Sequence, residues 1–205
     1  MTGEKDRKVS WNTRHRNRRS KGSGMGKIYF VRHGQTYWNE ENKICGITDI
    51  ALTPLGHEQA VQAGKSIMES GIDFDEIICS PLIRAQETAR HISEITGRPI
   101  RIDERLREQN FGKYEATYTK NEEFLLSKEH FADSYDGGES LLRLAQRVYN
   151  LLDEVKKDPE GKTYLLVAHN GVARSVESYF RSMTNKEYAS FGVKNCTVVT
   201  YEWDD

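Results

Sequence analysis

The stretch Ile28-Tyr29-Phe30-Val31-Arg32-His33-Gly34 decides how this chain folds and where its chemistry lies. Its first four residues form an apolar run, which predicts a buried strand over 27–31. A strand ending in Arg32-His33-Gly34 places a guanidinium and an imidazole at its carboxyl edge, where open α/β sheets bind ligands. Because the guanidinium fork matches tetrahedral oxyanions, we expect an anion here, and phosphate above all. We expect Gly34 to allow a sharp turn and the close approach of a substrate.

Strand and helix patterns alternate along the rest of the chain. Short apolar runs predict further strands over 75–79, 100–102, 163–168 and 197–203, the last of them at an edge of the sheet. Periodicity, N-cap residues and closing glycines predict helices over 53–70, 80–96, 114–127, 140–157 and 171–183. This order predicts a three-layer α/β/α sandwich around a mainly parallel sheet, with a small helical cap over 104–140.

The chain of 205 residues fits one domain preceded by a basic leader. Residues 1–24 hold eight Lys/Arg against two Asp/Glu and almost nothing apolar, which predicts a disordered segment. We interpret this leader as an addition left from cloning; a native arm for nucleic acid or a membrane surface is the alternative. We expect a single folded domain over 25–205, with a mildly acidic surface and only local anion affinity.

The number of cysteines and the hydropathy of the chain limit where the protein is expected and what it binds. The three cysteines are too few and too far apart for a disulfide framework or a tetrahedral zinc site, so we expect a reducing cytoplasm and no metal. No apolar run approaches the ~20 residues of a membrane span, and no signal-peptide core follows the basic leader. We therefore expect neither a membrane nor a nucleic acid as partner, and we leave a homodimer open.

Polar groups follow three of the predicted strands at the point where each ends. Arg32-His33-Gly34 follows the first, Ser80-Pro81 follows the second with Arg84 one turn further on, and His169-Asn170-Gly171 follows the fourth. Since the carboxyl ends of parallel strands meet at one edge, two histidines and two arginines would converge there beside two helix N-termini. Core packing does not account for this combination, which predicts a deep anion pocket.

The same segments resemble the histidine phosphatase superfamily, the phosphoglycerate mutase-like or branch-one group. The matching segments appear in the family's order and extend over the chain from Met25 onward; they are 32–39 (RHGQTYWN), 52–60 (LTPLGHEQA), 80–89 (SPLIRAQETA), 106–115 (LREQNFGKYE), 138–140 (GES) and 168–171 (AHNG).

The resemblance implies a phosphohistidine mechanism without cofactor or metal. His33 would attack phosphorus as a neutral imidazole, a form that Arg32 and Arg84 favour by electrostatic repulsion. Arg32, Arg84 and His169 would bind the phosphoryl oxygens, and Glu108 would act as general acid and then general base. Further phosphate or substrate contacts would come from Gln35, Thr36, Asn39, Gly46, Asn170 and Gly171.

Other polar residues have structural interpretations. We expect His57, His15, His91 and His130 on the surface, Thr53-Pro54 as a helix cap, and Glu139-Ser140 as a loop and helix start. Tyr37 and Trp38 could face substrate or pack. The aromatic residues of 114–137 weakly suggest an apolar or ring-bearing leaving group, although half of them could be core.

The resemblance covers both phosphatases and mutases, and the residues favour a phosphatase. Mutases of this family carry a longer insert after the acid and adjacent arginines for a carboxylate, whereas this chain has no arginine between Glu108 and Gly138. Cys45 also stands before Gly46 where mutases tend to have Thr-Gly. We expect hydrolysis of a small phosphate monoester; the alternatives are a cofactor-dependent phosphoglycerate mutase and an inactive phospho-ligand-binding module.

Overall fold

The strands form one five-stranded sheet in the computed structural model, which describes residues 26–204. The strands are β1 (Gly26–Arg32), β2 (Glu76–Cys79), β3 (Ile100–Ile102), β4 (Tyr164–Ala168) and β5 (Val198–Trp203). Their spatial order is β3-β2-β4-β1-β5. All pairs are parallel except β1 with β5, which lies antiparallel at the edge. The mainly parallel sheet and its edge strand are therefore confirmed.

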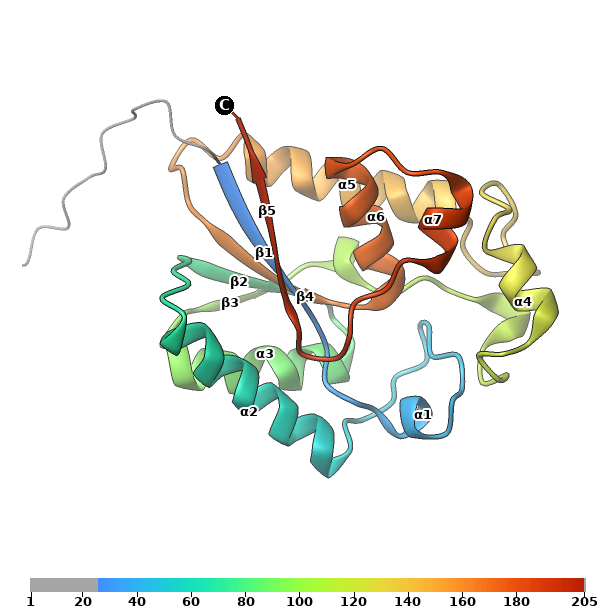
Figure 1. Ribbon diagram of the computed structural model, residues 1–205, viewed down its shortest axis with the longest axis horizontal. Helices are drawn as coiled ribbons and strands as arrows, with labels where there is room; N and C mark the ends of the chain where they lie inside the picture. Colours follow the sequence, from blue (N-terminus) through green and yellow to red (C-terminus); the bar gives the residue numbers. More distant parts are fainter. Residues whose placement is uncertain (1–25, 205) are drawn as a thin grey trace, which may run out of the picture.

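Helices cover both faces of this sheet (Figure 1). The helices are α1 (Tyr37–Glu40), α2 (Pro54–Glu69), α3 (Ile83–Thr96), α4 (Glu122–Ser127), α5 (Leu141–Lys156), α6 (Asn170–Phe180) and α7 (Asn185–Ser190). In Figure 1, α2 and α3 lie on one side of the sheet, α5 and α6 lie on the other, and α4 is set apart near one end. The three-layer α/β/α sandwich is confirmed.

Side chains of the central strands point alternately to the two faces of the sheet, and each face has its own hydrophobic core. Phe30 of β1 and Leu166 of β4 pack with the apolar face of α5, including Leu144. Tyr29 and Val31 of β1 point to the opposite face, where they pack with α2 and α3. A strand that is buried on both faces has no solvent-exposed side, so all of its positions can be apolar, which explains its continuous apolar sequence.

The cap differs from its predicted form. Only Glu122–Ser127 is α-helical within the expected helix 114–127; Gly112–Tyr114 forms a 3₁₀ turn, and Ala116 has a left-handed φ of 65°. This segment instead forms a small core of its own from Ile44, Phe111, Tyr114, Phe124 and Tyr135. Aromatic packing therefore overrode the helical pattern.

The packed cap also removes the support for an apolar leaving group. Tyr114, Phe124 and Tyr135 belong to the cap core, and Phe131 packs against the main core. Tyr118 alone of the five aromatic side chains stands exposed. Four of these five side chains therefore belong to the packing, so the aromatic residues no longer support the suggestion of a ring-bearing leaving group.

Strand register brings the polar strand ends together. Arg32 pairs with Ala168, so His33 and His169 follow directly at the ends of neighbouring parallel strands. Cys79 pairs with Val167, which places Ser80 beside the same edge. The amide of His33 continues the ladder by donating to the carbonyl of Ala168 at 2.9 Å.

Gly34 serves a different purpose from the predicted sharp turn, since it is not among the described glycines with positive φ. A Cβ at Gly34 would clash with the carbonyl of Gly56, and a Cβ at Gly56 would clash with the carbonyl of Gln35. The two glycines therefore let the first turn of α2 pack directly on the loop after β1. Thr53 caps that helix as predicted, accepting the amide of Gly56 at 3.0 Å.

The helix after β2 begins later than predicted. Ser80 and Pro81 precede the helix, and α3 starts at Ile83 with Leu82 in the N-cap position. Arg84 still lies in its first turn, as expected. Within residues 26–204, no helix is long and apolar enough to cross a membrane.

Candidate active site

The imidazole of His33 is buried and fixed in one orientation. Its Nδ1 lies 2.7 Å from the carbonyl oxygen of Gly34, which can only accept, so Nδ1 carries the proton. Nε2 is then unprotonated and keeps its lone pair. Burial first, and then the guanidiniums of Arg84 and Arg32, lower the pKa of His33 well below its usual 6.5. The ring is therefore a neutral base or nucleophile at physiological pH.

Two arginines flank this ring and are held by backbone carbonyls. Arg32 donates from Nη1 to the carbonyl of Val193 at 2.9 Å. Arg84 is fully buried and donates to the carbonyls of Thr48 at 2.9 Å and Gly46 at 2.6 Å. Carbonyls orient a guanidinium without neutralising it, so both positive charges remain available to an anion. Burial, the largest cause, lowers the pKa of Arg32.

His169 completes the group from the neighbouring strand. Its ring centroid lies 5.1 Å from that of His33, and its Nε2 lies 2.6 Å from the hydroxyl of Ser80. Burial and the charge of Arg84 lower the pKa of His169 well below its usual 6.5. Buried polar atoms are normally paired. Among the described residues, three buried nitrogens of this group have no partner: Nδ1 of His169, Nε of Arg32 and Nε of Arg84.

Glu108 brings the carboxylate of the site from the segment after β3. Its side chain is 4% exposed. Oε1 accepts the amide of Gln109 and Oε2 accepts the amide of Gly171 in the first turn of α6, both at 2.9 Å. A helix N-terminus favours a carboxylate, and this contact fixes the direction of the side chain.

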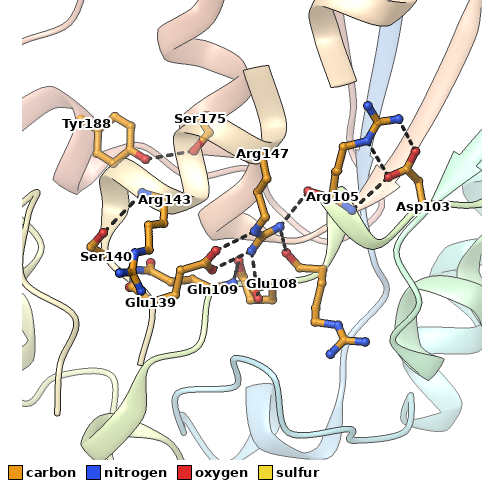
Figure 2. A network of polar contacts seen from close by, with 11 residues as sticks. Asp103, Arg105, Glu108, Gln109, Glu139, Ser140, Arg143, Arg147, Ser175 and Tyr188 are labelled. Carbon is orange, nitrogen blue, oxygen red and sulfur yellow. Dashed lines mark hydrogen bonds and ion pairs between the residues drawn. The ribbon is translucent and has the colours of Figure 1, made fainter. Parts of the chain in front are cut away.

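The sequence analysis missed Arg147, which holds the backbone around Glu108 (Figure 2). From α5, it binds both carboxylate oxygens of Glu139 at 2.7 Å and donates to the carbonyls of Arg105 and Arg107 at 2.7 and 2.6 Å. A longer bond of 3.3 Å reaches the carbonyl of Glu108 itself. Arg147 bonds to residues in other segments of the chain. In the sequence, the periodicity of its helix therefore showed Arg147 only as one more polar position.

The other predicted phosphate contacts in the loop after β1 are engaged with one another. Thr36 and Asn39 form a capping box at the start of α1, in which each side chain accepts the other's amide. The side chain of Gln35 accepts the hydroxyl of Thr53 at 2.9 Å. Within the part of the chain that the structure describes, the Nδ2 of Asn39, the Nε2 of Gln35 and the hydroxyl hydrogen of Thr36 donate to no protein group, so these three side chains keep a donor for a ligand.

The backbone amides of Gly46 and Gly171 and the side-chain oxygen of Asn170 are also committed to protein groups, whereas the amide and Nδ2 of Asn170 donate to no group in the described part of the chain. The amide of Gly171 is taken by Glu108, and the amide of Gly46 donates to Glu115 at 3.2 Å. The Oδ1 of Asn170 accepts the amide of Val193 at 2.8 Å. These residues therefore shape the pocket by positioning Glu108, Arg84 and the loop before β5.

The remaining histidines of the described chain lie away from this group. His57 and His91 interact with each other on neighbouring helices at 3.0 Å, and His91 is partly buried rather than solvated. His130 is exposed, while His15 lies outside the described residues. Across residues 26–204, no group of three or more His, Cys, Asp or Glu side chains could hold a metal ion.

This arrangement is suited to bind an anion beside a neutral imidazole, which makes it a candidate anion-binding site at the carboxyl edge of a parallel sheet. The comparison with protein families agrees with that class. The chain belongs to the histidine phosphatase superfamily (branch 1), whose model matches residues 28–205.

Individual relatives include mutases and phosphatases. The chain is 32% identical to a protein named "Probable phosphoglycerate mutase GpmB" from Escherichia fergusonii, over 88% of this chain and 86% of that one. It also resembles the structure of a mycobacterial glucosyl-3-phosphoglycerate phosphatase, with a TM-score of 0.74, 26% identity, and 86% and 90% of the two chains covered. A phosphoserine phosphatase from Entamoeba histolytica, solved with 3-phosphoglyceric acid, gives a TM-score of 0.74 and 29% identity, covering 85% and 89%.

Proposed function

We propose that this protein is a phosphomonoesterase that hydrolyses small phosphorylated metabolites through a phosphohistidine on His33. The observation that carries the proposal is the 2.7 Å contact from Nδ1 of His33 to the carbonyl of Gly34. It leaves Nε2 as the free nucleophilic atom, on a ring whose lowered pKa keeps it neutral. Superfamily membership and the phosphatases among its structural neighbours support the same reaction class.

In the first step, Nε2 of His33 attacks phosphorus and the bond from phosphorus to the ester oxygen breaks. Glu108, as the general acid, gives a proton to the departing oxygen, which leaves as an alcohol. Arg32, Arg84 and His169 stabilise the charge on the three remaining phosphoryl oxygens. Asn39 adds a hydrogen bond from its amide.

In the second step, water replaces the alcohol. Glu108, now ionised, takes a proton from the water while its oxygen attacks phosphorus, and the bond from phosphorus to Nε2 breaks. Inorganic phosphate leaves and His33 returns to its neutral state. The positive charge of the two arginines stands where a metal ion would otherwise act, so we propose that the reaction needs no metal.

The proposal extends to setting and partners. All three cysteines are free thiols in the structure, which fits a reducing cytoplasm. The partner is the small phosphate monoester itself, and neither nucleic acid nor membrane is needed by the chemistry. Assembly as a homodimer remains one option that the oligomeric state in solution will decide.

The alternative function is phosphoglycerate mutase, because the relative from Escherichia fergusonii carries that name. A mutase must return the phosphoryl group from His33 to a second hydroxyl instead of losing it to water. The cap favours hydrolysis, since it holds no arginine from 109 to 137 that could grip the carboxylate as the resemblance to mutases requires.

The deciding experiment measures phosphate release from a panel of phosphomonoesters in the presence of EDTA. The panel holds an aryl phosphate, sugar phosphates, α-ribazole phosphate and 3-phosphoglycerate, and the formation of 2-phosphoglycerate is followed in parallel. We expect release that survives EDTA and is lost in His33→Ala. Interconversion of phosphoglycerates with little release would establish a mutase, and loss of activity with EDTA would contradict the metal-independent mechanism.

A further inference from the structure

His57 and His91 bring two imidazoles together outside the active site, one on α2 and the other on α3. Nδ1 of His57 lies 3.0 Å from Nε2 of His91, and the ring centres lie 5.3 Å apart in an edge-on arrangement. Both helices cover the same face of the sheet (Figure 1). The two side chains are 39% and 20% exposed, so solvent and small ions reach the pair. No step of the proposed reaction uses these rings.

A carboxylate stands beside the outer nitrogen of each ring. Oε2 of Glu87 lies 3.7 Å from Nε2 of His57, and Oε2 of Glu94 lies 3.8 Å from Nδ1 of His91. Within the described part of the chain, this oxygen of Glu87 is buried and has no hydrogen-bond partner. A carboxylate beside an imidazole favours a proton on the nearer nitrogen. The two outer nitrogens are therefore the ones that carry hydrogen.

This assignment leaves two lone pairs facing each other. A neutral imidazole has one N–H and one lone pair, so the inner nitrogens carry no hydrogen when both outer ones do. If an inner nitrogen carried hydrogen instead, one outer lone pair would face a carboxylate. Burial first, and then the neighbouring ring of His57, lower the pKa of His91, which disfavours an extra proton between the rings. The pair is thus arranged to share a cation other than a proton.

The spacing of the inner nitrogens fits two ligands of one metal ion. Imidazole nitrogens bind transition metals at about 2.0–2.1 Å, and two such bonds at a right angle place the nitrogens about 3 Å apart. The observed distance is 3.0 Å. Tetragonal Cu²⁺ and Ni²⁺ hold neighbouring ligands at this angle, and tetrahedral Zn²⁺ needs about 0.3 Å more. Across residues 26–204, no group of three or more His, Cys, Asp or Glu could hold a metal, so water would complete the coordination.

We propose that His57 and His91 form a binding site for a divalent transition-metal ion that joins α2 to α3. Nδ1 of His57 and Nε2 of His91 are the ligands, and Glu87 and Glu94 orient the rings through their outer nitrogens. Hard cations such as Mg²⁺ prefer oxygen ligands and should not bind here. The site is separate from the proposed reaction, which needs no metal, and so goes beyond it.

The two helices that this ion would join also support the loop after β1. The amide of Gly34 donates to the hydroxyl of Thr88 on α3 at 3.0 Å, and the amide of Gln35 donates to Oε1 of Gln59 on α2 at 2.9 Å. An ion that binds only the folded arrangement of α2 and α3 stabilises the protein by mass action. We therefore expect the melting temperature to rise with the concentration of the metal.

The test titrates the whole chain, freed of metal with EDTA and then of EDTA, with Zn²⁺ and with Mg²⁺ in a calorimeter. We expect one Zn²⁺ per chain, no Mg²⁺, and a melting temperature that rises with Zn²⁺. His57→Gln and His91→Gln should each abolish Zn²⁺ binding. Glu87→Gln keeps both ligands and should weaken the affinity by about tenfold. With one equivalent of Cu²⁺, the EPR spectrum should show nitrogen ligands that both histidine variants lose.

Matched variants and the metal-free protein separate binding from folding. His15→Gln and His130→Gln each remove a histidine outside the pair and should bind Zn²⁺ as the wild type does. Circular dichroism without metal shows whether the variants fold. Zn²⁺ binding that survives in both His57→Gln and His91→Gln would overturn the site. Absence of Zn²⁺ binding to the wild type would show that the rings share a proton and would overturn it as well. None of these measurements depends on phosphate release.

Discussion

The carboxylate of Glu108 and the backbone amide of Gly171 are joined by a hydrogen bond of 2.9 Å between Oε2 and the amide nitrogen. The two residues come from different parts of the chain, one after β3 and the other in the first turn of α6. Through this bond the helix that begins beside His169 sets the position of the group that we propose as the general acid. The start of α6 and the proposed general acid are therefore linked, and small changes at Gly171 should affect catalysis.

Gly171→Ala should displace Glu108, because the new Cβ would clash with its Oε1. We expect kcat to fall by about 10²-fold or more on alkyl phosphates, a size typical of losing a general acid. Steady-state kinetics on glycerol 3-phosphate checks this. Gly64→Ala in α2 is the matched control, since its Cβ would meet Ile95 and the backbone of Ile92 and no residue of the site. Equal activity of Gly171→Ala and wild type would contradict the positioning role of this bond.

Glu108→Ala should discriminate between leaving groups. An alkoxide needs a proton as it departs, whereas an activated aryl oxide does not, so we expect a loss of about 10²–10⁴-fold on alkyl phosphates and a much smaller one on p-nitrophenyl phosphate. The measurement is kcat/KM for both substrates. Losses of equal size on the two substrates would show that Glu108 is not the general acid.

Arg147→Ala should affect catalysis without touching substrate. The side chain binds Glu139 and donates to the carbonyls of Arg105, Arg107 and Glu108. Its loss leaves these mostly part-buried acceptors unpaired and frees the segment that bears the acid. We expect lower kcat on alkyl phosphates, with about 2–4 kcal/mol lost from the free energy of unfolding.

The control for this variant is Arg143→Ala, which removes an exposed arginine one turn earlier on the same helix. Its activity and its urea midpoint should match the wild type. If the kcat loss in Arg147→Ala is the same on aryl and alkyl phosphates, Arg147 stabilises the fold only and does not position Glu108.

The sequence predicted the sheet well because its strands carry redundant information. The apolar run at Ile28–Val31 and the polar residues directly after it are both local signals, and the parallel register then brings His33 and His169 together. The structure of the cap could not be predicted from local sequence signals in the same way. Its residues 114–127 show a helical pattern, but the aromatic side chains pack on Ile44, which lies some seventy residues earlier.

The contacts around the site were harder to predict than its principal residues. Arg32, His33 and Arg84 stand next to strand ends or helix starts, which motif and topology place directly. The partners of Gly171 and Gly46 are Glu108 and Glu115, whose side chains come from distant segments. Sequence alone treated these amides as free for phosphate, since nothing local shows that a carboxylate already occupies them.

The two buried histidines should make folding stability depend on pH. The pKa values of His33 and His169 lie well below 6.5 in the folded protein, because of burial and the nearby arginines. In the unfolded chain both return to about 6.5. Below that pH the unfolded state binds more protons than the folded state, so the free energy of unfolding falls as the pH drops below 6.5.

From pH 7.5 to pH 5.5 we expect each of these histidines to remove about 1 kcal/mol from the free energy of unfolding. Urea denaturation at the two pH values measures the change. The double variant His33→Gln and His169→Gln keeps the size of the side chains but cannot titrate, so its stability should fall by about 2 kcal/mol less than that of the wild type. An equal fall in the double variant and the wild type would show that both rings accept protons readily in the folded state, and His33 would then be cationic in mild acid and unable to act as the nucleophile there.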